Sequence, residues 1–416
     1  EDLIYLLFLP AYSSSTTRYI KQRTTTTNKS IIELERIIMV ASLKERADAA
    51  TKEIGTLSAE IQKTLASKRD PKTTLVTAAT SSGSALAEVR KPSTQVKCRR
   101  KLEGHFGKIT AIDWSGDGNT IVSASQDGNL LIWDAYSTSK KQDVRLKSAS
   151  QHVMSVCMEQ TTGRFVACGG LDNACSVYEI GQPEGKAVLK AELVKHEGYL
   201  SDCHFFHSPS KMLTSSADET TLLWDVEHGS ILHTFQEHKA NILSVALVGQ
   251  TNFLSTSIDK TIKLWDVRSS AKEGSVQTFT GHEADVNGIT VVGSSGNTFA
   301  TCSEDGTVRV WDCRSYGEVA QFGELLDLSQ AEEDPFGDSS DMGFTSITSS
   351  HSGRLLFCGH SEGSVECFDV LTNTPNSDPY YTLHNAHEIY VSCVKVSPVG
   401  NALCTASWDT KLKLFA

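Results

Sequence analysis

Short apolar runs separated by polar turns recur along most of the chain, and each group of runs ends in the same way. In residues 281–312, a Gly-His pair precedes an apolar run at 286–292, and a turn near Gly296 leads to a further run that closes at Trp311-Asp312. Short apolar runs bounded by Gly, Asn, Asp and Ser are typical of β-strands. The chain therefore consists largely of copies of one strand-rich unit.

The copies share a spacing as well as a pattern. Their last strands close at Trp133-Asp134, Tyr178-Glu179, Trp224-Asp225, Trp265-Asp266, Trp311-Asp312, Phe368-Asp369 and Leu414-Phe415. Near the turn before each of these strands lies an acid, namely Asp127, Asp172, Asp218, Asp259, Asp305, Glu362 and Asp409. A histidine opens most copies: His105, His152, His196, His238, His282 and His387. Units of this kind are WD40 repeats, and seven of them predict an all-β fold, a seven-bladed β-propeller.

A small hydroxyl side chain precedes the turn acid in most copies, which predicts one hydrogen-bonded chain inside each blade. Buried polar groups must find partners, so His, Ser or Thr, Asp and Trp are expected to occur together. The predicted network residues are His105, Ser123, Asp127, Trp133, His196, Thr214, Asp218, Trp224, His238, Ser255, Asp259, Trp265, His282, Thr301, Asp305 and Trp311. We interpret these residues as structural, and expect neither catalysis nor metal binding from them.

The first 95 residues follow a different pattern. Residues 1–38 contain an apolar run that Pro10 ends well short of a membrane span, and we expect a disordered or non-native extension before a start at Met39. Over 39–67, apolar residues recur at near-heptad spacing, which predicts a coiled-coil α-helix. Its predicted seam consists of Leu43, Ala47, Ala50, Ile54, Leu57, Ile61 and Leu65. Such a helix needs a partner, either from another chain or on its own propeller, and 68–95 reads as a linker.

The ends of the repeat region predict how the propeller closes. The last copy ends at Phe415, so it lacks an outer strand. The spare strand pattern at 96–102 precedes the first copy, and we predict that it pairs with the outer edge of the last blade. The propeller would then span 96–416. One connection is longer than the others, and its acidic residues 323–341 predict an exposed loop.

Composition narrows the functional classes. A formal charge of −11 argues against a general nucleic-acid binder. The 11 cysteines are scattered and form no CxxC pair, which fits reduced thiols and the cytosol. No nucleophile–base set, metal spacing or phosphate loop stands apart from the repeats. The sequence therefore predicts a non-enzymatic protein without cofactors.

The repeat also locates a candidate binding face. The residue before each turn acid is expected at the edge of the central opening: Gln126, Leu171, Ala217, Ile258, Glu304, Ser361 and Trp408. The third residue after each opening histidine is expected beside it: Lys108, Ser155, Tyr199, Asn241, Asp285 and Tyr390, with Met154 adjoining. Aromatic side chains in a charged frame are typical of a protein interface, and Trp408 is the predicted anchor.

Several segments resemble the β subunit of heterotrimeric G proteins, over about residues 40–416. They are Ser-Ala-Ser-Gln-Asp-Gly at 123–128, Leu-Ile-Trp-Asp-Ala-Tyr at 131–136 and, above all, Val-Ala-Cys-Gly-Gly-Leu-Asp-Asn-Ala-Cys-Ser-Val-Tyr at 166–178. Residues 198–201, 278–283, 352–356 and 407–409 agree. The resemblance implies a non-enzymatic subunit of receptor signal transduction, paired through the 43–65 helix with a γ subunit or a γ-like domain of a larger regulator.

The same resemblance implies that one propeller face binds a GDP-bound Gα and engages effectors when Gα dissociates. The matching contact positions are Lys108, Leu131, Met154, Leu171, Tyr199, Asp285, Asn287 and Trp408, and Lys140 would meet the Gα N-terminal helix. Asn241 and Glu304 join this set from the repeat spacing. The implied location is cytoplasmic, at the inner face of the plasma membrane, with membrane attachment only through lipidation of the partner.

The chain departs from the family pattern at several of these positions. Thr110, Asn129, His152, Asn241 and Glu304 stand where the family commonly has Tyr, Lys, Trp and two Asp. These differences indicate a divergent member, and they bear on affinity and on the choice of Gα. The alternative is a WD40 scaffold of another pathway, such as a coiled-coil corepressor or a ligase adaptor.

Overall fold

The computed structural model describes Lys52 and residues 96–416, apart from gaps at 138–139, 146–151, 181–186, 270–273, 294–295, 316, 327–342 and 373–377. The chain divides into two units, residues 1–72 and 73–416, and the account below concerns the second. The predicted extension, coiled-coil helix and linker lie outside the described residues, with the exception of Lys52. Most of the predicted acidic loop does so as well.

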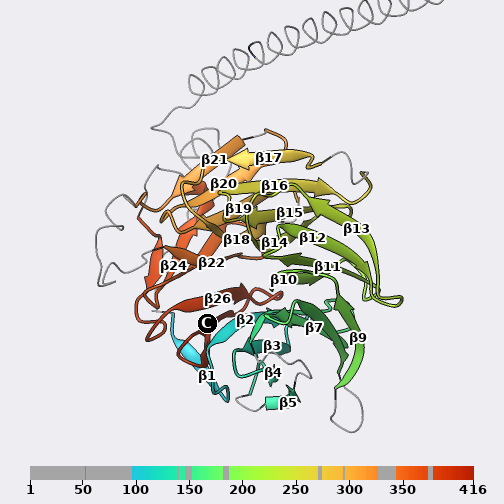
Figure 1. The fold of residues 1–416 in the computed structure, drawn as a ribbon. Helices are drawn as coiled ribbons and strands as arrows, with labels where there is room; N and C mark the ends of the chain where they lie inside the picture. Colours follow the sequence, from blue (N-terminus) through green and yellow to red (C-terminus); the bar gives the residue numbers. More distant parts are fainter. Residues whose placement is uncertain are drawn as a thin grey trace, which may run out of the picture. The chain divides into compact units, whose positions relative to one another are not determined.

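The described part of the chain folds into seven four-stranded sheets around a ring (Figure 1), which confirms the predicted seven-bladed propeller. Blades 1 to 3 consist of β2 (Ile109–Trp114), β3 (Thr120–Ser125), β4 (Asn129–Asp134), β5 (Lys140–Arg145); β6 (Val153–Met158), β7 (Phe165–Gly170), β8 (Ala174–Glu179), β9 (Val188–Val194); and β10 (Leu200–Phe205), β11 (Lys211–Ser216), β12 (Thr220–Asp225), β13 (Ser230–Gln236). Blades 4 and 5 consist of β14 (Ile242–Val248), β15 (Asn252–Ser257), β16 (Thr261–Asp266), β17 (Gln277–Thr280); and β18 (Val286–Val292), β19 (Thr298–Ser303), β20 (Val308–Asp312), β21 (Gly317–Phe322).

Blades 6 and 7 complete the ring. Blade 6 consists of β22 (Phe344–Ser349), β23 (Leu355–His360), β24 (Val365–Asp369) and β25 (Tyr381–Leu383), with the 3-10 turn η2 (Val370–Thr372) after β24. Blade 7 consists of β26 (Val391–Val396), β27 (Leu403–Ser407), β28 (Lys411–Phe415) and β1 (Cys98–Glu103). The chain therefore supplies the outer strand of its last blade from the beginning of the repeat region.

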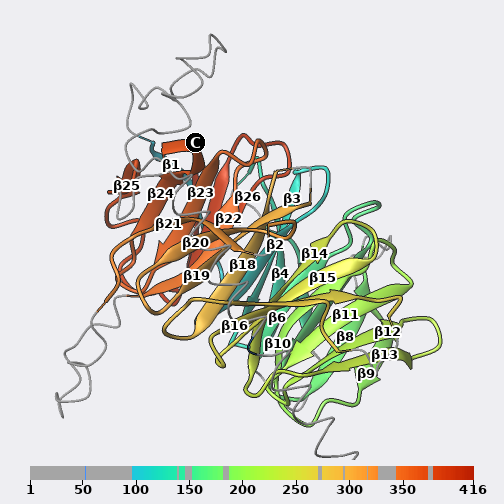
Figure 2. The ribbon, with the colours of Figure 1, turned by 90° about the horizontal axis from the view of Figure 1, so that it is seen from above.

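The pairing of β1 with β28 closes the ring. The two strands are antiparallel, with Cys98 opposite Phe415 and Leu102 opposite Leu412. Figures 1 and 2 both place β1 beside the C-terminus. The strand begins two residues later than the predicted range of 96–102 and ends at Glu103. Because β28 is paired on both sides, the closing blade offers solvent the outer edge of β1, which carries basic residues.

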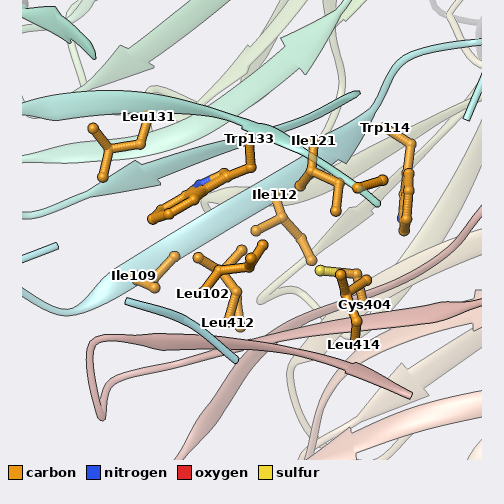
Figure 3. Close-up of a cluster of buried hydrophobic side chains, with 12 residues drawn as sticks. Leu102, Ile109, Ile112, Trp114, Ile121, Leu131, Trp133, Cys404, Leu412 and Leu414 are labelled. Atoms are coloured by element: carbon orange, nitrogen blue, oxygen red, sulfur yellow. The ribbon is translucent and has the colours of Figure 1, made fainter. Parts of the chain in front are cut away.

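The core lies between the blades and follows from the residue pattern of each strand. Inner and central strands are covered on both faces, as in β3, where five of six residues are buried. Outer strands alternate, as in β9, because only one of their faces meets a neighbouring blade. At the seam between blades 7 and 1, Leu102, Trp133 and Leu412 pack with Ile112 and Cys404 (Figure 3). This seam joins the two ends of the repeat region.

Polar side chains on the inner strands also join neighbouring blades. Thr110 Oγ1 donates to the carbonyl of Val153 at 2.7 Å, and Asn287 Nδ2 donates to the carbonyl of Phe344 at 2.9 Å. At the closure, Trp114 Nε1 donates to the carbonyl of Lys395 at 3.2 Å. These bonds satisfy polar groups of the inner strands and tie neighbouring blades together.

Candidate protein-binding face

One hydrogen-bonded chain recurs inside the blades. In blade 5, His282 Nδ1 lies 2.9 Å from Asp305 Oδ2, and His282 Nε2 lies 2.8 Å from Thr301 Oγ1. Trp311 Nε1 donates to the same hydroxyl at 2.9 Å. The equivalent contacts join His105, Ser123, Asp127 and Trp133; His196, Thr214, Asp218 and Trp224; and His238, Ser255, Asp259 and Trp265. Blade 7 has the same chain in His387, Thr405 and Asp409, with Phe415 at the terminal aromatic position.

The turn aspartates hold two loops together. Asp305 Oδ2 accepts the amide of Glu283, next to the histidine, while Oδ1 accepts the amide of Thr307 beyond the turn. Burial acts to raise the pKa of Asp305, but the hydrogen bonds, that of His282 foremost, outweigh it and hold this pKa well below its usual range. The carboxylate therefore stays ionised and ties the loop before the inner strand to the turn between the second and third strands.

A backbone hydrogen bond then brings two predicted positions together. In blade 7, the amide of Trp408, just before the turn aspartate, donates to the carbonyl of Tyr390, just before the inner strand, at 3.1 Å. The same bond joins Gln126 to Lys108, Leu171 to His152, Ala217 to Tyr199, Ile258 to Asn241, Glu304 to Asp285 and Ser361 to Gly343. We call these fourteen residues the rim. Because the blades repeat around one ring, the seven pairs lie on the same face.

The rim bonds correct the prediction for blade 2. His152 is not an opening histidine but the residue just before the inner strand, equivalent to Lys108 and Tyr199. Ser155, expected at the rim, is buried at 2% exposure inside β6. The backbone at position 170 lies close to the carbonyl oxygen of His152, and only glycine fits there. A Cβ on Gly170 would lie 2.0 Å from that oxygen. Gly170 of the 166–178 segment is therefore required by the packing of this loop.

Three rim residues form a stacked cluster at the junction of blades 7 and 1. The rings of Tyr390 and Trp408 stack with centroids 4.2 Å apart and planes inclined by 21°. The Nζ atom of Lys108 lies 3.7 Å from the centroid of the Trp408 ring. Stacking and cation–π contact each favour this geometry before any partner arrives. We call Lys108, Tyr390 and Trp408 the aromatic clamp.

The other predicted rim residues surround the opening at varying depth. Leu171 is 48% exposed, and Glu304 is exposed. Tyr199, Asn241 and Asp285 are half-buried. Burial raises the pKa of Asp285, while the charge of Lys260 acts in the opposite direction. The rim thus combines an apolar side chain, amide and phenol groups and two acids, a mixture found at protein interfaces.

Met154 and Asn287 lie one layer below the rim. In every blade the register between the first two strands shifts after the first paired residue of the inner strand. The residues skipped at this bulge are Thr110, Met154, Ser201, Leu243, Asn287, Thr345 and Ser392, and all of them line a central hollow of about 140 Å³. The bulge directs these side chains away from the ladder. We call the seven residues that line this hollow the channel residues. Of these, Met154 and Asn287 are half-buried.

Two predicted contact residues differ from the rest. Leu131 is 3% exposed and packs beside Trp133 in the seam of Figure 3, because β4 is an interior strand covered on both faces. It offers no surface, so the prediction that Leu131 contacts a partner is wrong for this structure. Lys140 is the first residue of β5 and its backbone pairs with Trp133; its side chain is not described. The predicted γ-binding residues, 43–65, lie outside the described part of the chain.

Sequence reasoning missed exposed apolar residues beside the clamp. Phe106 directly follows the opening histidine of blade 1 and is 92% exposed, and its amide donates to Asp127. Ile389 directly precedes Tyr390 and is 46% exposed. Their positions beside an opening histidine and a predicted rim residue were visible in the sequence, but their exposure was not. Together with the rim residue Leu171, they give this face an apolar component.

Within the described residues, no group of three or more His, Cys, Asp or Glu side chains is arranged to hold a metal ion. No helix in the same residues is long and apolar enough to cross a membrane.

Comparison with known proteins agrees with the geometry. A family model for G protein beta WD-40 repeat proteins matches residues 52–416. The chain is 36% identical to the guanine nucleotide-binding protein subunit beta of Solanum tuberosum over 397 residues, which cover 91% of this chain and 97% of that protein. Proteins of the same name from Zea mays and Arabidopsis thaliana are also 36% identical, at the same coverage. These findings confirm the resemblance, and the chain belongs to the G protein β family of WD40 repeat proteins.

Proposed function

We propose that this chain is the β subunit of a heterotrimeric G protein and that its rim binds the switch region of a GDP-bound Gα. The family is non-enzymatic and acts in signal transduction, and the relatives named above are guanine nucleotide-binding protein β subunits. The observation that carries the proposal is the aromatic clamp. A pre-stacked Trp408 held by Lys108 and Tyr390 loses little side-chain freedom on binding, as expected of an interface anchor.

The mechanism is competition for one surface. GDP-bound Gα covers the clamp together with Phe106 and Leu171. Nucleotide exchange remodels the Gα switch and lowers its affinity for the rim, so the freed rim becomes available to effectors. A ligand shifts such an equilibrium only by its differential affinity for the two states. The propeller can stay rigid throughout, because the change occurs in Gα.

Pairing with a γ subunit, or with a γ-like domain of a larger regulator, would use the predicted seam from Leu43 to Leu65. Attachment to the inner face of the plasma membrane would follow from lipids carried by the partners. The substitutions at His152, Asn241 and Glu304 change the charge and size of the rim on blades 2, 4 and 5. They are the positions at which this chain would discriminate among Gα subunits.

The test is a pull-down with residues 39–416 as bait, run with GDP and again with GDP plus aluminium fluoride. Recovery of a small coiled-coil chain, together with a Gα that is lost on activation, supports the proposal. A matched bait carries Trp408→Ala, and a control bait carries Val188→Ala, because Val188 is 50% exposed and lies opposite Glu179, at the end of blade 2 far from the rim. If a folded bait recovers neither Gα nor a γ-type chain, the proposal fails and a WD40 scaffold of another pathway remains.

A further inference from the structure

A group of thiols lies at the seam between blades 2 and 3. Cys157 on β6 and Cys203 on β10 belong to the same buried cluster, and their sulfur atoms are 3.7 Å apart. The hydroxyl of Ser155 lies 3.6 Å from the sulfur of Cys203. A disulfide requires a sulfur–sulfur distance of about 2.05 Å, so the two sulfur atoms need to approach by roughly 1.7 Å.

One thiol of this pair, that of Cys157, borders a cavity. A hollow of about 460 Å³ opens among the ends of the inner strands that are far from the rim, and Cys157 is one of its lining residues. Asp113, His204 and Lys395 line the same hollow, so it is polar enough to hold water and small solutes. A hydrogen peroxide molecule, close to water in size and polarity, fits the same space.

We propose that Cys157 and Cys203 form a reversible oxidation site, in which peroxide converts the two thiols into a disulfide that joins β6 to β10. The proposal is independent of the identity of the binding partners. It concerns the propeller itself and the seam between two adjacent blades.

The reaction proceeds in two balanced steps. The sulfur of Cys157 attacks one peroxide oxygen, an S–O bond forms, the O–O bond breaks, and the departing hydroxide leaves as water with the thiol proton. The sulfur of Cys203 then attacks the Cys157 sulfenic sulfur, the S–S bond forms, and the S–O bond breaks to release a second water with the Cys203 proton. Two thiols are oxidised by two electrons, and one peroxide is reduced to two waters.

The order of the steps follows from access to the cavity. Cys157 lines the hollow, whereas Cys203 does not. Cys157 is therefore the thiol that meets peroxide, and Cys203, whose sulfur lies 3.7 Å away, is the resolving thiol. Burial raises the pKa of Cys157, so the first step is expected to be slow.

Cys175 is the third thiol of this cluster and the competing partner for Cys203. Its sulfur lies 3.3 Å from the sulfur of Met212. A pair of Cys175 and Cys203 would have no thiol at the cavity, because Cys157 alone of the three lines it. This difference assigns the disulfide to Cys157 and Cys203.

A disulfide between β6 and β10 would affect the rim, because both strands begin beside rim residues. Cys157 is the fifth residue of β6, whose second residue is the channel residue Met154. Cys203 is the fourth residue of β10, which directly follows the rim residue Tyr199. Joining the two strands fixes the spacing between these neighbouring positions, so oxidation would act on the binding face from below.

The experiment treats the full chain with graded hydrogen peroxide, blocks free thiols with N-ethylmaleimide, and maps linked peptides by mass spectrometry before and after reduction. We expect a Cys157–Cys203 peptide, lighter than the reduced pair by two hydrogen atoms, that disappears on reduction. Exposed Cys98 serves as an internal measure of the peroxide dose. Cys157→Ala and Cys203→Ala should abolish the product, whereas Cys175→Ala, in the same buried cluster, should retain it.

A second readout is the apparent melting temperature. Oxidised wild type should melt above its reduced form, and Cys203→Ala should show no such difference. The proposal is overturned if Cys98 is fully oxidised while Cys157 and Cys203 still react with N-ethylmaleimide after unfolding. It is equally overturned if the linked peptide contains Cys175 in place of Cys157. Because wild type is mapped directly, poor folding of a variant does not decide the result.

Discussion

Replacing Asp305 by Asn tests whether the hydrogen-bonded chain stabilises the blades. Asp305 and His282 both have fully buried side chains. The carboxylate accepts four hydrogen bonds, from His282 Nδ1, the Glu283 amide, the Thr307 amide and the Thr307 hydroxyl, at 2.9, 2.9, 2.8 and 2.6 Å. Asn preserves the shape but replaces one acceptor oxygen with an NH2 group, which then faces two donors.

The magnitude follows from those contacts. Hydrogen bonds to a charged group contribute about 1.5–3 kcal/mol each, and a donor left unsatisfied in the interior costs about 1–3 kcal/mol. Because contacts in one network are not additive, we expect Asp305→Asn to lower the free energy of unfolding by about 3–5 kcal/mol, the range for breaking a buried charged pair. Asp127→Asn is the matched comparison, because Asp127 is 10% exposed and its contact with His105 is longer, at 3.2 Å. We expect about half the loss there.

The assay is thermal unfolding at a fixed scan rate as a function of pH. The folded-state pKa of Asp305 is depressed, so its stabilisation is fully present above the unfolded pKa of about 3.9 and is lost as pH falls through the folded value. The gap between wild type and Asp305→Asn should therefore be constant from pH 7 to about pH 5 and should narrow below about pH 4.

Two results would contradict this reasoning. A melting temperature of Asp305→Asn within about one degree of wild type at pH 7 would mean that the network contributes little to stability. A larger loss in Asp127→Asn than in Asp305→Asn would show that burial does not set the size of the effect. Blade 1 lies at the ring closure, so its variant also reports on that seam.

Three further changes test the face, the closure and the blade packing. Trp408→Ala should weaken Gα binding by about 1–3 kcal/mol in a titration while leaving the melting temperature unchanged; a comparable loss of stability would reassign the clamp to folding. Deletion of residues 96–103 should expose the edge of β28 and give aggregated protein in size-exclusion chromatography, and a monodisperse, cooperatively melting product would refute the closure argument. Gly169→Ala should destabilise the chain by about 1–3 kcal/mol, because a Cβ there meets two Leu200 side-chain atoms at 2.5 and 2.9 Å, whereas Gly317→Ala meets only a carbonyl oxygen at 3.7 Å and should be tolerated.

The repeat spacing predicted the blades and the network because both depend on local geometry. A Ser or Thr four residues before the turn acid can reach the histidine and the tryptophan only if strands and turn have fixed lengths, and that constraint is visible in the sequence. The strand that completes blade 7 was also visible, since Phe415 ends the last repeat and one strand pattern remained unassigned. In the structure that strand is Cys98–Glu103.

The missed features depend on which neighbour covers a side chain. Leu131 lies in an interior strand, and its sequence environment does not distinguish it from an exposed position. His152 lies just before the inner strand of blade 2, a position that the histidine spacing of the other blades did not predict. Phe106 sits beside an opening histidine that is buried, and only the three-dimensional loop reveals that its own ring faces solvent. Tertiary packing thus sets details that periodicity leaves open.

The pairing of β1 with β28 has a consequence for the timing of synthesis. Cys98 leaves the ribosome first and Phe415 about 300 residues later, which at roughly 5–20 residues per second is a delay of about 15–60 s. During this interval six blades can assemble in order while β1 has no partner. The ring then stays open, with two unpaired strand edges. We therefore expect the nascent chain to need shielding until β28 emerges, and loss of β28 would leave the ring open.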